Sequence, residues 1–145
     1  MKVNVKKLRE NAVVPTYGSQ YSAGADLYAA IESPVSILPD ETFLVKTGIA
    51  MEIPTGYVGL VFARSGLATK RGLAPANKVG VIDSDYRGEI MVALHNHSKT
   101  SQTIESGERV AQISIVPFLS AEFEVVSELS ETERAGGGFG STGRK

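Results

Sequence analysis

The feature that most constrains this chain is a series of short β-type runs separated by turn residues. The runs are Lys2–Val5, Val35–Leu38, Thr42–Ile53, Tyr57–Ala63, Glu89–Asn96, Arg109–Pro117 and Glu122–Val126. The breaks between them are Ser33-Pro34, Pro39-Asp40, Pro54-Thr55-Gly56 and Glu105-Ser106-Gly107. Helical periodicity is almost absent. The pattern therefore predicts an all-β domain of the sandwich, jelly-roll or barrel type.

Length and composition exclude several classes of protein. A chain of 145 residues suits a single domain with a core of its own. The absence of cysteine excludes disulfides, thiolate catalysis and cysteine-based zinc sites. The N-terminus has no apolar signal region, and no run approaches the ~20 apolar residues of a membrane span, so we expect a cytoplasmic protein without a membrane partner. A net charge of −1 gives no general attraction to nucleic acid.

Charge is distributed unevenly along the chain. From Ile53 to Ile82 every charged residue is basic, namely Arg64, Lys70, Arg71 and Lys78. A second stretch without acids, Ala135 to Lys145, follows Arg134. Two basic segments on either side of a carboxylate-containing segment favour a small polyanion as the ligand, rather than a nucleic-acid duplex.

The carboxylate segment, Gly80–Ile90, combines two aspartates, a tyrosine and an arginine between glycines. Asp, Ser and Gly are depleted in strands and favoured in turns, so the segment predicts a strand, a tight turn and a second strand. Two interpretations stay open from these residues alone. Either it is a β-hairpin whose Asp and Gly residues serve turn geometry, or it is part of a functional site.

Arg64-Ser65-Gly66 lies where a strand should lead into a helix. We expect a short helix over Ser65–Lys70, with Ser65 as its cap and Gly72 as its end. A helix N-terminus beside an arginine can bind phosphate. The alternative is an ordinary serine cap beside a solvated arginine.

Three further polar positions each have a structural and a functional interpretation. Gln112 occupies a half-buried position on its strand, where a cross-strand hydrogen bond would satisfy it. Asp26 in Ala23-Gly24-Ala25-Asp26-Leu27 suits a turn that enters a strand. His95 and His97 share a strand face, but no third metal ligand lies nearby, and we interpret them as non-functional.

The C-terminal segment from Arg134 to Lys145 is rich in glycine and has one large apolar residue, Phe139. Such a segment should be mobile when free. Gly138–Gly143 matches the dinucleotide pattern G-x-G-x-x-G, but the required βαβ context is missing. Backbone N–H groups in a glycine-rich curve can nonetheless bind phosphates. The alternative is a frayed terminus.

Together these motifs resemble, in order, the five motifs of the trimeric dUTPase family. The resemblance covers nearly the whole chain. It implies an all-β jelly-roll (β-clip) homotrimer with active sites shared between subunits, a domain at 1–133 and a flexible arm at 134–145 that closes over the site. It also implies Mg²⁺-dependent hydrolysis of dUTP to dUMP and pyrophosphate, which limits uracil in DNA and supplies dUMP for thymidylate synthesis.

The resemblance also implies roles for particular residues. Asp83 is similar to the base that activates the attacking water, and Gln112 to a catalytic residue that contacts phosphate or water. Tyr86 is similar to the ring that packs on deoxyribose and excludes a 2′-hydroxyl. Asp26 resembles a water-mediated contact of Mg²⁺, which substrate phosphates mainly hold. The other implied substrate contacts are Arg64, Ser65, Gly66, Asn77, Gly80, Val81, Ile82, Met91, Arg134, Phe139, Gly140, Ser141 and Thr142.

Two positions depart from the family pattern. Ala63 stands where proline is common, and Ala135 stands where glycine is usual and should resist a positive φ. A dCTP deaminase shares the fold but needs a catalytic glutamate where this chain has Ala93. A binding protein without turnover would have no use for Asp83.

Overall fold

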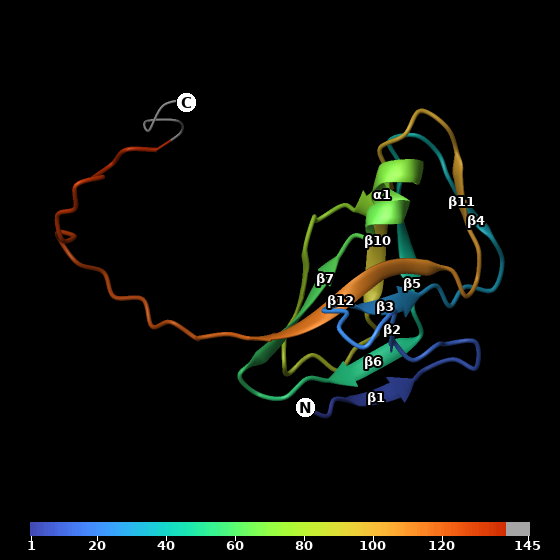
Figure 1. Ribbon diagram of the computed structural model, residues 1–145, viewed down its shortest axis with the longest axis horizontal. Coiled ribbons are helices and arrows are strands. Elements are labelled where there is room, and N and C mark those ends of the chain that lie inside the picture. The colour runs from blue at the N-terminus through green and yellow to red at the C-terminus, as the bar shows by residue number, and fades with distance from the viewer. Residues whose placement is uncertain (139–145) are drawn as a thin grey trace.

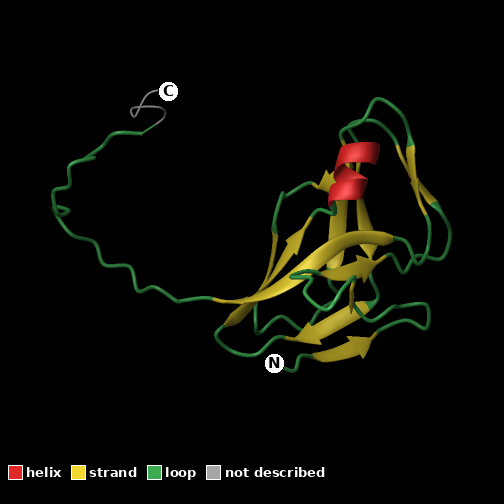
Figure 2. Ribbon diagram, viewed as in Figure 1, coloured by secondary structure: helices red, strands yellow, loops and turns green. Residues whose placement is uncertain are grey.

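The computed structural model describes residues 1–138 and consists mainly of strands with one short helix (Figures 1 and 2). The predicted site residues Phe139, Gly140, Ser141 and Thr142 lie outside the described residues. The elements in order are β1 (Asn4–Lys7), β2 (Thr16–Tyr17), β3 (Ala25–Tyr28), β4 (Val35–Ile37), β5 (Thr42–Lys46), β6 (Ile49–Glu52), β7 (Tyr57–Phe62), α1 (Ser65–Arg71), β8 (Leu73–Pro75), β9 (Gly80–Ile82), β10 (Met91–Asn96), β11 (Gln102–Ile104) and β12 (Arg109–Pro117). The predicted all-β class is confirmed.

The strands form two main sheets and two strand pairs, and all pairings are antiparallel. The five-stranded sheet has the order β2-β3-β12-β7-β9, and the three-stranded sheet has the order β5-β10-β8. The remaining pairs are β1-β6 and β11-β4. In Figure 1 the long β12 strand crosses the front of the molecule, and α1 leads into β8 and packs against it.

The core lies between these sheets and draws on strands of each. Leu73 of β8, Leu94 of β10, Ile104 of β11 and Val110 of β12 are all fully buried. The register of β12 against β3 shifts between Arg109 and Ala111, so Val110 and Ala111 are buried in succession. A bulge of this kind interrupts the regular pairing of the two strands.

The predicted strand Thr42–Ile53 is two strands separated by Thr47 and Gly48. Gly48 has φ 66°, and a Cβ there would lie 2.7 Å from the Ala12 Cβ, so the chain needs glycine to turn at this point. The two halves pair with different partners, β5 with β10 and β6 with β1.

The carboxylate segment is not a hairpin. β9 pairs with β7, whereas β10 begins only at Met91 and pairs with β5 and β8. Residues 83–90 therefore connect two different sheets. The strand–turn–strand pattern was predicted, but sequence alone did not show that each strand has another partner.

The predicted helix is confirmed, and Gly72 ends it in the left-handed region at φ 68°. The prediction that Ser65 caps the helix is wrong. Arg64 occupies the N-cap position, and no side chain there makes a capping hydrogen bond.

After β12 the described chain leaves the strands as an extended segment (Figure 1). The predicted strand Glu122–Val126 is absent from the described structure, and the exposed fractions of Phe123 and Val125 are 94% and 98%. Arg134 Nε donates to the Gly137 carbonyl at 2.9 Å, and Ala135 adopts φ 41° despite the expected resistance. Among the described residues, no helix has the length and apolar character needed to cross a membrane.

Candidate functional site

The first candidate site is a cavity of about 540 Å³, here called the arginine cavity. Its polar lining includes Asp26 of β3, Arg64 and Ser65 at the start of α1, and Arg109 and Gln112 of β12. Gly66 also lines it. The structure thus brings together the predicted residues Asp26, Arg64, Ser65, Gly66 and Gln112 from three separate motifs.

A buried carboxylate organises the two arginines of this cavity. Asp26 is 8% exposed, and its Oδ1 accepts a hydrogen bond from Arg64 Nε at 2.7 Å. Its Oδ2 lies 3.4 Å from Arg109 Nη1. The contact with Arg64 uses Nε, which leaves the terminal nitrogens of that guanidinium directed elsewhere. Two guanidinium groups beside one carboxylate give the cavity a positive balance that suits an anion.

Gln112 joins the walls of the arginine cavity. Its Nε2 donates to the Ala63 carbonyl at 2.9 Å, so the expected cross-strand hydrogen bond is present. Gln112 pairs with Asp26 of β3 on one side and Phe62 of β7 on the other. A Cβ at Gly24 would lie 2.5 Å from Gln112 Oε1, so a larger residue there would require the glutamine side chain to move. The side chain therefore ties the chain entering Arg64 to the strand of Asp26.

The second candidate site is a cavity of about 230 Å³, here called the tyrosine cavity. Its lining residues are Leu44, Val81, Ile82, Asp83, Tyr86, Glu89, Ile90 and Met91. The predicted residues Val81, Ile82, Asp83, Tyr86 and Met91 therefore meet here. The Tyr86 N–H donates to the Asp83 carbonyl at 3.2 Å, which closes a turn and leaves the Asp83 side chain exposed.

Predicted residues Asn77 and Gly80 lie next to this cavity in the chain. A Cβ at Gly80 would lie 3.6 Å from the Asn77 amide nitrogen and 3.1 Å from the Val61 Cβ. The backbone of β9 thus packs closely against β7 and the Asn77 side chain.

Two contacts hold the hydroxyl end of the Tyr86 side chain. Its hydroxyl donates to the Glu89 carbonyl at 3.0 Å. A Cβ at Gly88 would lie 2.9 Å from Cε2 of the tyrosine ring, so the ring lies against Gly88 and would have to shift if a larger residue stood there. The ring remains 41% exposed and forms part of the cavity wall.

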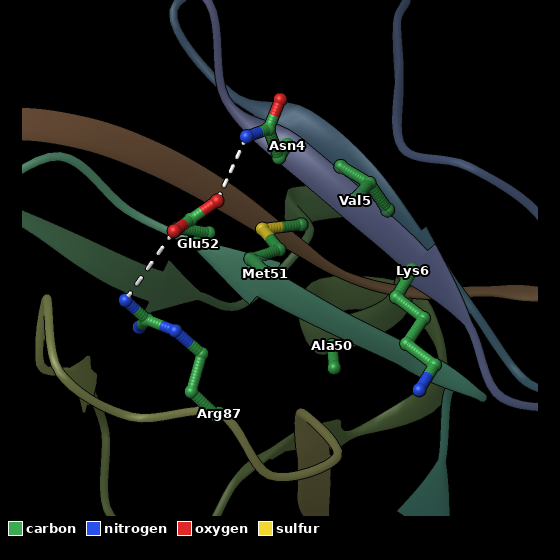
Figure 3. Close-up of a pocket in the computed structure, with 7 residues that line it drawn as sticks. All are labelled: Asn4, Val5, Lys6, Ala50, Met51, Glu52 and Arg87. Atoms are coloured by element: carbon green, nitrogen blue, oxygen red, sulfur yellow. Dashed lines mark hydrogen bonds and ion pairs between the residues drawn. The ribbon is translucent and has the colours of Figure 1, made fainter.

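Arg87 turns away from the aspartates of its own segment. Its Nη1 donates to the carbonyls of Ser84 and Tyr86, and its Nη2 lies 3.8 Å from Glu52 Oε1. Figure 3 shows Arg87 directed at Glu52, which also accepts a hydrogen bond from Asn4, at a neighbouring cavity of about 410 Å³. No ion pair between Asp85 and Arg87 occurs among the described contacts.

Glu89 has a perturbed pKa. Burial alone would raise it, but hydrogen bonds from Arg9 and the Gly48 N–H, with the charges of Arg9 and Lys46, outweigh burial and lower the pKa of this carboxyl below its ordinary value. Glu89 is therefore a fixed anion beside the tyrosine cavity.

Sequence reasoning missed Arg109, Gly24, Gly88 and Glu89. The position of Arg109, three residues before Gln112 at the start of the same strand, could have marked it as a candidate site residue. Gly88 and Glu89 follow Tyr86 directly, but nothing in their local pattern shows the contacts that they make.

The predicted residues do not meet in one cavity of a single chain. The arginine cavity and the tyrosine cavity have no lining residue in common. Arg134 is bonded to Gly137, in the segment beyond β12. The predicted residues of the described chain therefore fall into two separate sets.

Within residues 1–138, no three or more His, Cys, Asp or Glu side chains gather closely enough to hold a metal ion. The rings of His95 and His97 lie 4.4 Å apart, and His95 Nδ1 lies 2.9 Å from the Thr42 hydroxyl.

An all-β domain with a cationic cavity and a separate cavity bearing an exposed carboxylate and a ring defines a protein that handles a small anionic ligand. A family model described as dUTPase matches residues 10–143. The chain belongs to the dUTPase family, whose members are deoxyuridine triphosphate nucleotidohydrolases.

Individual relatives agree with this assignment. The deoxyuridine 5'-triphosphate nucleotidohydrolase of Hydrogenobaculum sp. (strain Y04AAS1) is 51% identical over 145 residues and covers 100% of both chains. A mutant of the Staphylococcus bacteriophage 80alpha dUTPase with dUpNHpp is 32% identical, with a TM-score of 0.90 and 98% of each chain covered. A mutant dUTPase from phage phi11 of S. aureus, described with a structural Mg(II) ion, is 29% identical, with a TM-score of 0.82 over 90% of this chain and 100% of that chain.

The Glu89 carboxylate should make stability depend on pH. Because its pKa is lower in the folded than in the unfolded chain, ionised Glu89 stabilises the fold above the unfolded pKa, and this contribution is lost as pH falls through that pKa towards the folded value. Urea unfolding from about pH 7 to about pH 3 should show a shallower loss of unfolding free energy in Glu89→Gln than in wild type. Parallel curves for the two proteins would contradict this role.

Proposed function

We propose that this chain hydrolyses dUTP to dUMP and pyrophosphate as a cytoplasmic, Mg²⁺-dependent homotrimer. In this role it limits uracil incorporation into DNA and supplies dUMP for thymidylate synthesis. The observation that supports this most strongly is the sorting of the predicted residues into two cavities. One is cationic and suits a triphosphate, and the other offers a carboxylate and a ring that suit water activation and a nucleoside.

The nucleoside binds in the tyrosine cavity. Tyr86 packs on the deoxyribose and leaves no room for a 2′-hydroxyl. Backbone groups of β9 and the side chains of Asn77 and Met91 surround the uracil. The close packing of Gly80 against β7 supports this role, because it brings the backbone of the strand within reach of a ligand edge.

The triphosphate binds in the arginine cavity. Arg64 supplies a guanidinium that Asp26 already orients, so less freedom is lost on binding. Ser65 and Gly66 supply backbone N–H groups of the first helical turn, which have no intrahelical acceptor. Arg109 adds positive charge from β12.

Asp83 is the general base. A water oxygen attacks the α-phosphorus, its proton passes to the Asp83 carboxylate, and the bond from that phosphorus to the bridging oxygen breaks, so that pyrophosphate leaves. Gln112 contacts phosphate or the attacking water. Its Nε2 is held by Ala63, which leaves Oε1 as the acceptor for that contact.

Mg²⁺ is held mainly by the substrate phosphates. When bound, it neutralises phosphate charge and so favours attack on phosphorus. Both Asp26 oxygens face guanidinium groups, which fits an indirect, water-mediated contact rather than direct ligation. A single carboxylate such as Asp26 beside the substrate phosphates suits Mg²⁺, because this ion usually keeps several of its waters and binds only one or two carboxylates.

Each active site is shared between subunits, with the arginine cavity of one chain facing the tyrosine cavity of another. The arm from Arg134 onward then closes over the ligand. Phe139 stacks on uracil, and Arg134, Gly140, Ser141 and Thr142 contact the phosphates. The separation of the two cavities within one chain supports the sharing.

Hydrolysis of dUTP and its dependence on Asp83 can be measured together. The wild-type protein with Mg²⁺ should release pyrophosphate from dUTP in preference to UTP, dTTP and dCTP. Asp83→Asn should lower kcat by at least ~10²-fold, because the water loses its base, while dUTP binding measured by calorimetry is retained. No pyrophosphate from wild type would refute the proposed activity, and unchanged kcat in the variant would remove Asp83 from its role.

Deletion of residues 134–145 tests the arm. The strands end at Pro117, so the shortened protein should melt at nearly the wild-type temperature and hydrolyse dUTP much more slowly, since the arm's contacts with the ligand are lost. Thermal unfolding and pyrophosphate release should be measured on the same preparations. A large fall in melting temperature would show that the segment is structural, and unaltered turnover would show that it is dispensable.

A further inference from the structure

We infer that Glu89 is a positioning residue for Tyr86 and thereby a determinant of selectivity for deoxyribose over ribose. This inference rests on the proposed function of Tyr86. The Glu89 carboxylate itself contacts none of the residues predicted to bind substrate. It is bonded instead to Arg9 and to the Gly48 N–H, at a junction beside the tyrosine cavity.

The junction joins three segments that are distant in sequence. The Glu89 carboxylate accepts hydrogen bonds from Arg9 Nε at 3.4 Å, Arg9 Nη2 at 3.3 Å and the Gly48 N–H at 2.8 Å. The Gly48 carbonyl in turn accepts from the Leu8 N–H at 2.7 Å. The N-terminal segment, the corner between β5 and β6 and the connection at 83–90 are therefore held at one point.

The next residue is held equally firmly. The Ile90 N–H donates to the Ile49 carbonyl at 2.8 Å, and the Ile90 carbonyl accepts from the Thr47 hydroxyl at 2.5 Å. Thr47 and Ile90 are fully buried. With its side chain and its successor both fixed, the Glu89 backbone has little freedom to move.

The Glu89 backbone carbonyl is the group that holds Tyr86. It accepts the tyrosine hydroxyl at 3.0 Å, and the ring lies against Gly88. The side chain of Glu89 fixes one end of the tyrosine ring through this carbonyl, while the opposite end of the residue is anchored by the turn at Asp83. Release of the carboxylate would let the ring shift and admit a bulkier sugar.

Arg71 and Glu108 form a comparable pair at the other end of the molecule, where Arg71 also meets Thr103 and Gln102. The Glu108 carboxylate also accepts from the Glu105 N–H at 3.1 Å. It is thus a carboxylate held by one arginine and one backbone N–H, as Glu89 is, but it contacts neither cavity.

The test compares Glu89→Gln with the matched control Glu108→Gln. Each substitution removes one charge from an arginine–carboxylate pair and should lower stability. Only Glu89→Gln should lower the ratio of kcat/KM for dUTP to that for UTP, by about tenfold, a range typical of a displaced pocket contact. A ratio equal to wild type in Glu89→Gln, or an equal fall in both variants, would overturn the inference.

A double-mutant cycle links Glu89 to Tyr86 directly. Tyr86→Phe removes the hydroxyl bond and should lower the same ratio, and Glu89→Gln/Tyr86→Phe should lower it no further, because both changes break one connection. Additive falls would overturn the inference. If Glu89→Gln does not fold, Arg9→Lys retains the charge but loses the two-nitrogen contact, and should lower the ratio in the same direction by less.

A measurement without substrate separates this inference from the proposed function. The chain has five tyrosines, so ¹³C-labelled tyrosine gives a simple ring spectrum, and loss of a signal in Tyr86→Phe assigns Tyr86. In ligand-free protein that signal should shift in Glu89→Gln and stay in place in Glu108→Gln. An unshifted signal would refute the positioning role, whereas inactive wild type with a shifted signal would refute only the proposed activity.

Discussion

The pairing of β12 on both of its edges determines where the polar groups of this molecule lie. β3 on one side carries Asp26, and β7 on the other leads into Arg64. Gln112 stands in the same register as both and bonds to Ala63 between them. The bulge near Arg109 aligns that arginine with Asp26 as well. One strand therefore assembles a cationic cavity from three sequence motifs, which is the chemistry that a triphosphate requires.

The passage from β9 to β10 sets the second half of the site. Because these strands belong to different sheets, the connection must cross between them, and it carries Asp83 and Tyr86 to the surface. It is held by buried contacts at Glu89 and Ile90 instead of a hairpin ladder. The tyrosine cavity shares no lining residue with the arginine cavity, which is the observation that supports the proposed sharing between chains.

Sequence patterns predicted an element correctly where the structure favoured by its own residues is also the one that its tertiary contacts stabilise. β12 has the predicted bounds of Arg109–Pro117, and Gly72 ends the helix as expected. Sequence could not show that β9 and β10 have different partners, because periodicity reports which faces are apolar and not which strands pair. Glu122–Val126 alternates like a strand but has no partner in the described structure. Arg109 and Glu89 were missed because their contacts are with residues distant in the sequence. Arg109 lies 83 positions from its partner Asp26, and Glu89 lies 80 positions from its partner Arg9.

Under the proposed function, one active site needs the arginine cavity of one chain and the tyrosine cavity of another. Asp83→Asn and Arg64→Ala proteins, each defective alone, can be unfolded, mixed and refolded together, and pyrophosphate release from dUTP then measured. If sites are shared, some mixed assemblies place an intact Arg64 opposite an intact Asp83, and activity should rise well above that of either variant. Activity no greater than the average of the two separately refolded variants would contradict the account.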